Sequence, residues 1–254
     1  MSILLQATDL TKTFGAENNQ KATVLDSINL NIEEGEFVAI MGQSGSGKST
    51  LLYNISGMDT MTSGEVSFGG ENYSHMSEEA MSKYRLENIG FIFQHSYLLK
   101  SLSIEDNILL PGLKLRKTPR DILYQRAKQL MEKMEIDNVA NHDINKVSGG
   151  QLQRAAICRA LINQPKIIFG DEPTGALNSS SAIAVMDIMN DINQSGTTIM
   201  IVTHDAKVAA RADRVIFLSD GKITAECALG KYKENSATLE REDKVKHFLK
   251  DKQF

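Results

Sequence analysis

The chain has 254 residues, with 28 Lys and Arg against 32 Asp and Glu and a formal net charge of −4. That length can bury a sizeable core and predicts one domain, because no stretch has the composition of a linker. The near balance of charge provides no basic field, so nucleic acid is excluded as the default partner. The two cysteines, Cys158 and Cys227, predict reduced thiols without a disulfide or metal role.

The amino terminus carries no signature of a targeting segment. It lacks a basic region followed by an apolar run, and no segment reaches the roughly 18 consecutive apolar residues of a membrane helix. We therefore expect a soluble chain that meets a membrane only through a partner.

The first forty residues predict strands, because apolar residues alternate or run together between polar and glycine-containing turns. These strands are expected at Ile3–Leu10, Ser27–Ile32 and Glu36–Met41.

A glycine-rich loop of the form Gly-x-x-x-x-Gly-Lys-Ser follows directly, between an apolar run and a segment compatible with a helix. Its glycines let several N–H groups point at one phosphate chain, and the next helix adds its positive end. Lys48 is expected to reach the β- and γ-phosphates, and Ser49 to bind magnesium. The expected binding positions are Gly42, Ser44, Gly45, Ser46, Gly47, Lys48, Ser49 and Thr50.

The middle of the chain predicts two further strands and then helices. The strands are expected at residues 64–69 and 89–93, around a helical segment that begins near Ser77. Thr118 is the expected cap of a helix with Pro119 at its first position. The residues expected at core spacing along that helix are Leu123, Ala127, Leu130, Met131 and Met134. Another helix is expected from Ser148.

The last part alternates strand and helix, which predicts a parallel sheet flanked by helices. Strands are expected at 166–170 and 198–202 with a helix at 180–192 between them, and residues 231–254 predict a solvated, partly helical tail. A basic membrane-surface helix is the alternative for the tail, although its acidic residues argue against it.

Acidic residues and a histidine follow the two late strands, where a parallel sheet places its ligands. Asp171 and Glu172 close one strand, where one carboxylate can serve magnesium and the next can orient or deprotonate a water. His204 follows the other and can hydrogen-bond a terminal phosphate. The run Ser148–Gln151 combines a hydroxyl cap, two glycines and a helix start, which makes it a second candidate phosphate contact.

Together with Gln94, these motifs in this order resemble the ATP-binding cassette ATPases over residues 3–228. The resemblance implies an α/β fold with a P-loop NTPase core and mostly parallel sheet, an N-terminal antiparallel β subdomain and a helical insertion near residues 95–162. It implies one domain over residues 1–229 and a charged extension over 230–254.

The same resemblance assigns the site residues. Catalysis is expected from Lys48, Gln94, Glu172 and His204. ATP is expected to meet Phe14, the loop 42–50, Gln94, Asp171 and the signature residues Ser148, Gly149, Gly150 and Gln151. Magnesium is expected at Ser49, Gln94 and Asp171. Two copies would pair head to tail, so that one signature closes over the ATP of the other copy.

Three positions depart from the family pattern. Phe14 replaces a tyrosine that stacks on adenine, which keeps the aromatic face. Val147 replaces a leucine. Asn178 replaces the aspartate that ends the D-loop segment 175–178, which places the coupling between the two sites in doubt.

Runs such as Asn107–Pro111 and Gly175–Leu177 resemble the branch that serves lipoprotein release, macrolide efflux and bacitracin-type peptide resistance, and favour the last. A permease is implied as partner, with the chain at the inner face of the cell membrane, and a permease helix is expected beside Gln94, Tyr97 and Leu98. Two alternatives stay open: a cassette that acts on ribosomes or DNA, and an ATP-dependent clamp without useful hydrolysis.

Overall fold

The computed structural model describes residues 2–15, 21–233 and 238–250, which divide into two compact units. The first unit combines residues 1–81 with 198–254, and the second is residues 82–197. Each unit is described by itself below.

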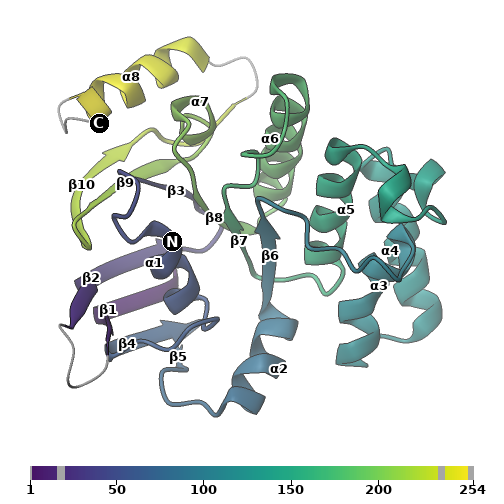
Figure 1. Ribbon diagram of the computed structural model, residues 1–254, viewed down its shortest axis with the longest axis horizontal. Helices are drawn as coiled ribbons and strands as arrows, with labels where there is room; N and C mark the ends of the chain where they lie inside the picture. Colours follow the sequence, from purple (N-terminus) through teal and green to yellow (C-terminus); the bar gives the residue numbers. More distant parts are fainter. Residues whose placement is uncertain (1, 16–20, 234–237, 251–254) are drawn as a thin grey trace. The chain divides into compact units, whose positions relative to one another are not determined.

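The first unit contains an antiparallel sheet in the strand order β2, β1, β4, β5 (Figure 1). In β2, buried and exposed residues alternate from Ser27 to Glu33, which places one face in the core. The expected strands are confirmed here: β1 and β2 are longer than predicted, β4 is displaced by one residue, and the two-residue β5 was not predicted. Their bounds are β1 Ile3–Phe14, β2 Ala22–Glu33, β4 Ser63–Phe68 and β5 Glu71–Asn72.

A second group of strands in this unit surrounds β3 (Phe37–Met41), which pairs in parallel with β8 (Thr198–Val202) and β9 (Arg214–Ser219). All residues of β3 and β8 are buried, so both strands consist of continuous apolar runs, as parallel strands covered on two faces do. The helices of the unit are α1 Lys48–Ile55, α7 Ala206–Ala209 and α8 Thr238–Lys250.

The hairpin of β9 and β10 (Lys222–Ala228) was not predicted. Ser219 pairs with Lys222 around a two-residue turn in which Asp220 and Gly221 have φ values of 48° and 74°. An Asp-Gly pair between strands is the signal of such a turn, but β10 is mostly exposed and its sequence lacks a clear apolar pattern.

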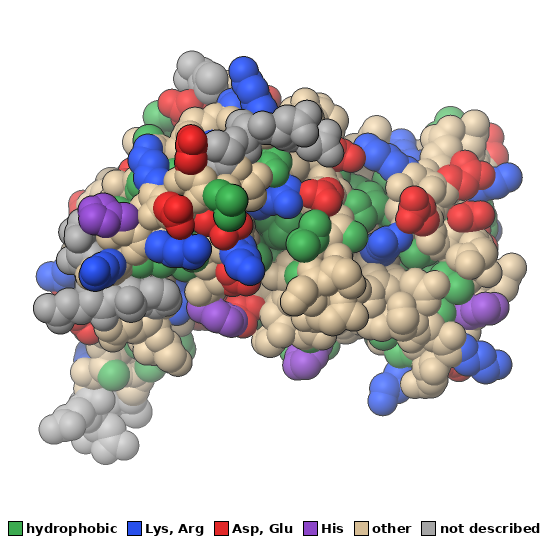
Figure 2. Space-filling view, turned by 90° about the horizontal axis from the view of Figure 1, so that it is seen from above, with side chains coloured by type: hydrophobic (Ala, Val, Ile, Leu, Met, Phe, Trp, Pro, Cys, Tyr) green, Lys and Arg blue, Asp and Glu red, His purple; other side chains and the backbone are tan. Residues whose placement is uncertain are grey.

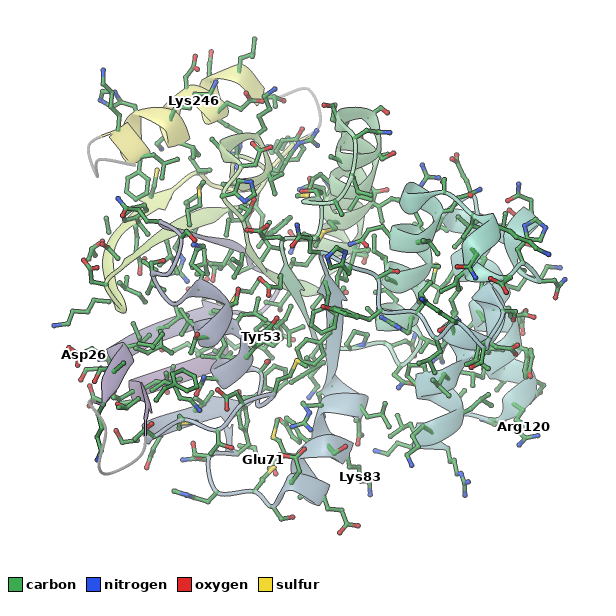
Figure 3. All side chains as sticks on the ribbon, in the orientation of Figure 1. Asp26, Tyr53, Glu71, Lys83, Arg120 and Lys246 are labelled. Carbon is green, nitrogen blue, oxygen red and sulfur yellow. The ribbon has the colours of Figure 1, made fainter. Side chains whose placement is uncertain are left out.

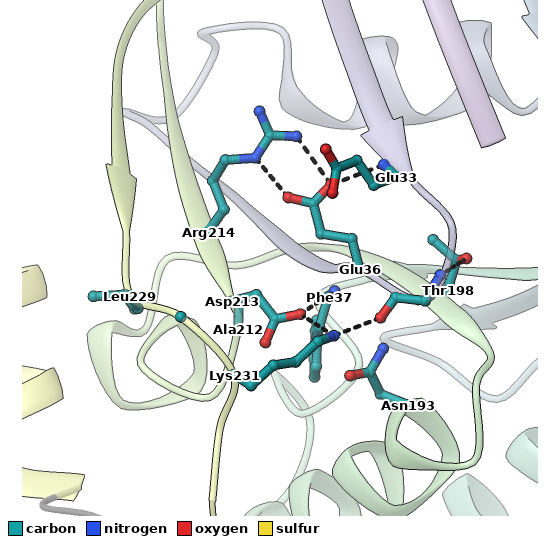
Figure 4. A network of polar contacts seen from close by, with 12 residues as sticks. Glu33, Glu36, Phe37, Asn193, Thr198, Ala212, Asp213, Arg214, Leu229 and Lys231 are labelled. Atoms are coloured by element: carbon teal, nitrogen blue, oxygen red, sulfur yellow. Dashed lines mark hydrogen bonds and ion pairs between the residues drawn. The ribbon is translucent and has the colours of Figure 1, made fainter. Parts of the chain in front are cut away.

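A polar network fixes the starts of these strands (Figure 4). Arg214 of β9 donates to Glu36 over 2.7 Å, and the carboxylate of Asp213 accepts from the Phe37 N–H over 2.8 Å and from Lys231 over 2.7 Å. The network holds the amino end of β3. The loop that begins at Gly42 follows the opposite, carboxyl end of the strand.

The second unit pairs β6 (Ile89–Phe93) with β7 (Ile167–Asp171) in parallel, as predicted. Helix α2 (Glu78–Asn88) begins in the first unit and ends in this one. The other helices are α3 Ile104–Leu115, α4 Arg120–Lys133, α5 Gly149–Leu161 and α6 Ser179–Gln194, with short 3-10 turns at Asp137–Val139 and Ile144–Lys146.

One predicted cap is wrong by a residue. Pro119 has extended backbone, with φ −53° and ψ 145°, and is itself the N-cap of α4, so Thr118 lies outside the helix. The predicted core positions Leu123, Ala127, Met131 and Met134 are buried, whereas Leu130 is only half-buried.

Helix α8 lies within the charged extension and buries one face. Val245 and Leu249 are buried, whereas Lys246, which is labelled in Figure 3, is exposed. Lys246 forms an ion pair with Asp243 over 3.6 Å. Figure 2 shows basic and acidic side chains interspersed on the face that it draws, in keeping with the balanced composition. No helix among the described residues is long and apolar enough to cross a membrane.

Candidate nucleotide site

The glycine-rich loop connects the carboxyl end of β3 to the first residue of α1 in the first unit. Gly42 has a φ of 154°, and a Cβ there would lie 2.0 Å from the carbonyl oxygen of Leu218. Gly47 has a φ of 99° and directly precedes the helix. Any other residue at Gly42 would require the loop to move, so its path depends on glycine.

The side chain of Lys48 bonds to the backbone of the loop that precedes it. The ammonium of Lys48 donates to the carbonyl oxygens of Gly42 over 2.8 Å and Gln43 over 2.7 Å, so it bridges the loop. Among the described residues, Ser46 has a buried Oγ without a hydrogen-bond partner. A Cβ on Gly45 would meet nothing within 4 Å, so the loop is open at that position.

These features fit a phosphate group. A cation, an unsatisfied hydroxyl and the N-terminal end of α1 all favour an anion, because each supplies positive charge or a hydrogen-bond donor. The remaining predicted contacts lie on the same segment: Ser44 is exposed, and Ser49 and Thr50 stand in the first turn of α1.

His204 follows β8, the strand that pairs in parallel with β3, and the phosphate loop follows β3. Val202 of β8 pairs with Ile40 of β3, and the Thr203 N–H donates to the Ile40 carbonyl oxygen over 3.1 Å. His204 is the next residue and is exposed. The loop and the histidine therefore follow the carboxyl ends of two paired parallel strands, as the sequence predicts.

In the second unit, Gln94 and Glu172 follow paired strands in the same way, because Phe93 pairs with Asp171. A Cβ added to Gly175 would lie 2.9 Å from Gln94 Nε2 and 3.1 Å from Glu172 Oε2. Both side chains therefore approach the same backbone position, and glycine at 175 leaves them room.

Glu172 has a left-handed backbone, with a φ of 47°. This conformation costs a non-glycine residue about 1–2 kcal/mol, and such residues cluster at functional sites. The turn directs the chain away from β7 immediately after Asp171, which sets the carboxylate of Glu172 beside Gln94.

The signature run begins α5 with a complete capping box. Gln151 N–H donates to Ser148 Oγ over 3.3 Å, and Ser148 N–H donates to Gln151 Oε1 over 2.9 Å. A Cβ on Gly149 would meet nothing within 4 Å, whereas one on Gly150 would lie 3.1 Å from Ser181 Oγ. The helix start is thus stable by itself and open at Gly149.

Gln153 is a residue of this region that the motifs did not reveal. Its side chain is 2% exposed, and its Nε2 donates to the carbonyl oxygens of Phe93 over 3.0 Å and Pro173 over 2.7 Å. It therefore links α5 to the residues that adjoin Gln94 and Glu172. The sequence could have revealed Gln153 only as a polar residue on the helical face that also carries Ala156 and Ile157, which are buried.

Asn178, where the family pattern has aspartate, is the N-cap of α6. Its Oδ1 accepts from Ser181 N–H over 2.9 Å and from Ser180 Oγ over 2.9 Å. Asparagine and aspartate cap helices about equally well, so the change removes a charge and keeps the local structure.

The proposed magnesium ligands have suitable chemistry. Ser49, Gln94 and Asp171 supply a hydroxyl, an amide oxygen and a carboxylate, and Mg²⁺ prefers oxygen donors while keeping several waters. No cluster of three or more His, Cys, Asp or Glu that could hold a metal occurs in the described part of the chain.

A family model described as "ABC transporter" matches residues 25–175. The matched range contains the phosphate loop, Gln94, the signature run, Asp171 and Glu172. Phe14 and His204 lie outside it.

Known proteins similar to the chain include transport ATPases. The bacitracin export ATP-binding protein BceA of Halalkalibacterium halodurans is 41% identical over 89% of this chain and 89% of its own length. The macrolide export ATP-binding/permease protein MacB of Aggregatibacter actinomycetemcomitans is 43% identical over 88% of this chain, which spans 34% of that longer protein.

A solved structure is similar along its whole length. It is a dimeric ATP-binding cassette in a post-hydrolysis state, bound to ADP and Pi, with a TM-score of 0.83 and 37% identity. The match covers 90% of this chain and 100% of the solved one.

Proposed function

Since this chain belongs to the ABC transporter family, as an ATP-binding ATPase subunit, we propose that it works as a head-to-tail homodimer that drives a separate membrane permease. The family and the ATPase activity come from the matches described above. The pairing of two copies, the separate permease and the transported molecule are proposed here.

The proposed roles in hydrolysis follow from the chemistry of the two units. In the first, Lys48 and the N–H groups of the phosphate loop bind the phosphates, and His204 donates to the terminal one. In the second, Glu172 orients or deprotonates the attacking water, and Gln94 and Asp171 would supply oxygen ligands for magnesium. In the first unit, Ser49 would supply a hydroxyl ligand for the ion. The ion, when bound, neutralises charge on the phosphates.

The start of α5 is the observation that carries the dimer. Ser148 already caps the helix, and Gly149 is open, so an anion can approach the N-terminal end without displacing a side chain. In the proposed dimer, this signature run binds the ATP that another copy of the chain holds. The dimeric state of the similar cassette supports this arrangement.

The relatives support export as the process served, and bacitracin-type peptide resistance is the branch we propose. BceA is named as a bacitracin exporter, and MacB combines an ATP-binding part with a permease. BceA is named as an ATP-binding protein and is matched over 89% of its own length, which supports a permease carried on a separate chain at the inner face of the cell membrane.

The dimer is tested with Glu172→Gln. This variant should bind ATP, fail to release phosphate and accumulate as a dimer in light scattering, because the water loses its general base. Lys48→Ala in the same background should stay monomeric with ATP. Steady-state hydrolysis at the wild-type rate, or a monomer at saturating ATP, would contradict the proposal.

The partner is tested by affinity purification from solubilised membranes. We expect an integral membrane protein to co-purify, and cells without the chain to become more sensitive to bacitracin than to macrolides. Ribosomal or chromosomal material in place of a membrane protein would support the non-transport alternative. Greater macrolide sensitivity would keep the transporter and change its substrate.

A further inference from the structure

Lys12 and Phe14 lie two residues apart on β1, so their side chains leave the same face of the strand. The ammonium of Lys12 lies over the Phe14 ring, 4.9 Å from its centroid, within the range of a cation–π contact. Lys12 is 9% exposed, whereas Phe14 is 47% exposed. One part of the ring therefore rests on a buried cation while another part faces solvent.

The cation is held in place by the turn after α1. Lys12 Nζ donates to Asp59 Oδ1 over 2.8 Å and to the Thr60 carbonyl oxygen over 2.5 Å. Because an ammonium has three donors and this one is nearly buried, two fixed acceptors leave it little freedom to move. The low exposure also argues against direct contact between Lys12 and a phosphate in the loop.

The same turn connects to the helix that begins at the phosphate loop. Asn54 of α1 donates from Nδ2 to the Thr50 carbonyl oxygen over 2.9 Å and to Asp59 Oδ2 over 3.4 Å. Lys12, Asp59 and Asn54 thus form a continuous chain of polar contacts from the Phe14 ring to α1.

We propose that Lys12 is a positioning residue for the nucleotide base: its ammonium supports the Phe14 ring, and the base stacks on the part of the ring that stays exposed. This inference rests on the proposed contact between Phe14 and adenine. A ring already held in orientation loses less freedom when the base binds, which increases affinity. The Lys12–Asp59–Asn54 contacts set this platform relative to the helix that follows the phosphate loop.

The test compares two ligands that differ in the base, magnesium ATP and magnesium tripolyphosphate, by calorimetry on the full chain. Lys12→Met removes the ammonium and keeps the stem. It should weaken ATP binding about three- to tenfold, because a ring that is no longer held in place loses more freedom when the base binds, and it should leave tripolyphosphate binding unchanged. Because misfolded protein would lose both ligands equally, the ratio of the two affinities is independent of the folded fraction.

Two variants serve as controls. Lys222→Met removes a lysine from the exposed ion pair with Asp26, a residue labelled in Figure 3, and should change neither affinity. Lys12→Arg keeps a cation and should retain most of the wild-type ratio.

Phe14→Ala separates the inference from its premise. It should weaken ATP binding and leave tripolyphosphate binding unchanged. In the Phe14→Ala background, Lys12→Met should then cause no further loss of ATP affinity. If Phe14→Ala changes the ratio and Lys12→Met does not, the role of Lys12 is wrong and the base contact stands. If Phe14→Ala leaves the ratio unchanged, both are wrong. If Lys12→Met lowers the affinities for ATP and tripolyphosphate equally, the Lys12 charge acts on the phosphates and not on the base, which also overturns the inference.

Discussion

At the scale of single residues, the buried amide of Gln153 has the most consequential position outside the recognised motifs. It serves two carbonyl oxygens, one before Gln94 and one after Glu172. A buried carbonyl left without a donor costs about 1–3 kcal/mol, so these two contacts hold the turns that carry both candidate catalytic side chains.

Gln153→Met should therefore lower the turnover number for ATP more than it changes KM, because the phosphate loop in the first unit keeps its structure. Steady-state kinetics would measure this difference. Gln129→Met on the exposed face of α4 is the matched control and should behave as wild type. A change in KM alone would contradict a role in placing Gln94 and Glu172.

Burial controls the chemistry of Cys158. Desolvation inside α5 raises the pKa of its thiol from 9.0 to about 12, and both cysteines are free and buried. In a Cys227→Ser background, the native protein should resist thiol reagents from pH 7 to 9 and react on unfolding.

The raised pKa of Cys158 also sets the direction of a pH effect on stability. The unfolded thiol releases its proton first, so its contribution to folding is complete below pH 9.0 and is lost as the pH rises toward about 12. Rapid labelling of the folded protein at pH 8 would contradict the assigned burial.

At the scale of elements, hydrogen bonds from Arg241 bind α8 to other segments of the first unit. Its guanidinium donates to the carbonyl oxygens of Ala210 over 2.8 Å, Ala212 over 2.6 Å, Leu229 over 2.9 Å and Gly230 over 3.1 Å. Two of these carbonyls, those of Ala210 and Ala212, lie within three residues of the end of α7, and α7 itself follows His204. A guanidinium has five N–H donors in a fixed planar fork, whereas a lysine ammonium has three, so arginine suits a site with four carbonyl acceptors.

Arg241→Met should loosen α8 and the segment after α7, with faster hydrogen exchange in both and little change in β3. We expect the loss of about 1.5–3 kcal/mol that accompanies removal of a charged hydrogen-bond donor. Lys246→Met, on the exposed side of α8, is the control. Unchanged protection of α8 would show that its apolar face alone holds it.

At the scale of the whole molecule, the predicted permease contact needs one correction. Leu98 is 7% exposed and belongs to the core, whereas Tyr97 and Leu99 are 65% and 48% exposed. The backbone there is held by Arg159, which donates to the carbonyl oxygens of Ser96 over 2.6 Å and Tyr97 over 2.8 Å. The exposed neighbours, and not Leu98, are the residues that a partner could contact.

Leu99→Glu should reduce co-purification with the membrane partner and leave nucleotide binding unchanged, because it places a charge on an apolar contact. Leu239→Glu is the matched control, since Leu239 is an exposed leucine on α8. Equal recovery of membrane protein with Leu99→Glu and wild type would exclude this surface as the docking site.

Much of the site follows from local sequence. Glycines that need unusual backbone, a cap at Ser148 and acidic residues after apolar strands are recognisable because each requirement involves a few neighbouring residues. Buried runs such as β3 and β8 are equally clear. The β9–β10 hairpin escaped prediction because β10 is stabilised by pairing with β9 more than by its own pattern.

The sequence by itself determined the ligand class, the order of the motifs and most elements, since these depend on spacing within short segments. Only the tertiary structure decided that Gln153 holds two distant turns, that Leu98 is buried while Leu99 is exposed, and that Asp59 holds the Lys12 ammonium over the Phe14 ring. Each of these is a contact between residues far apart in the chain or a difference in burial between neighbours. Such relations arise from packing, which periodicity and composition do not encode residue by residue.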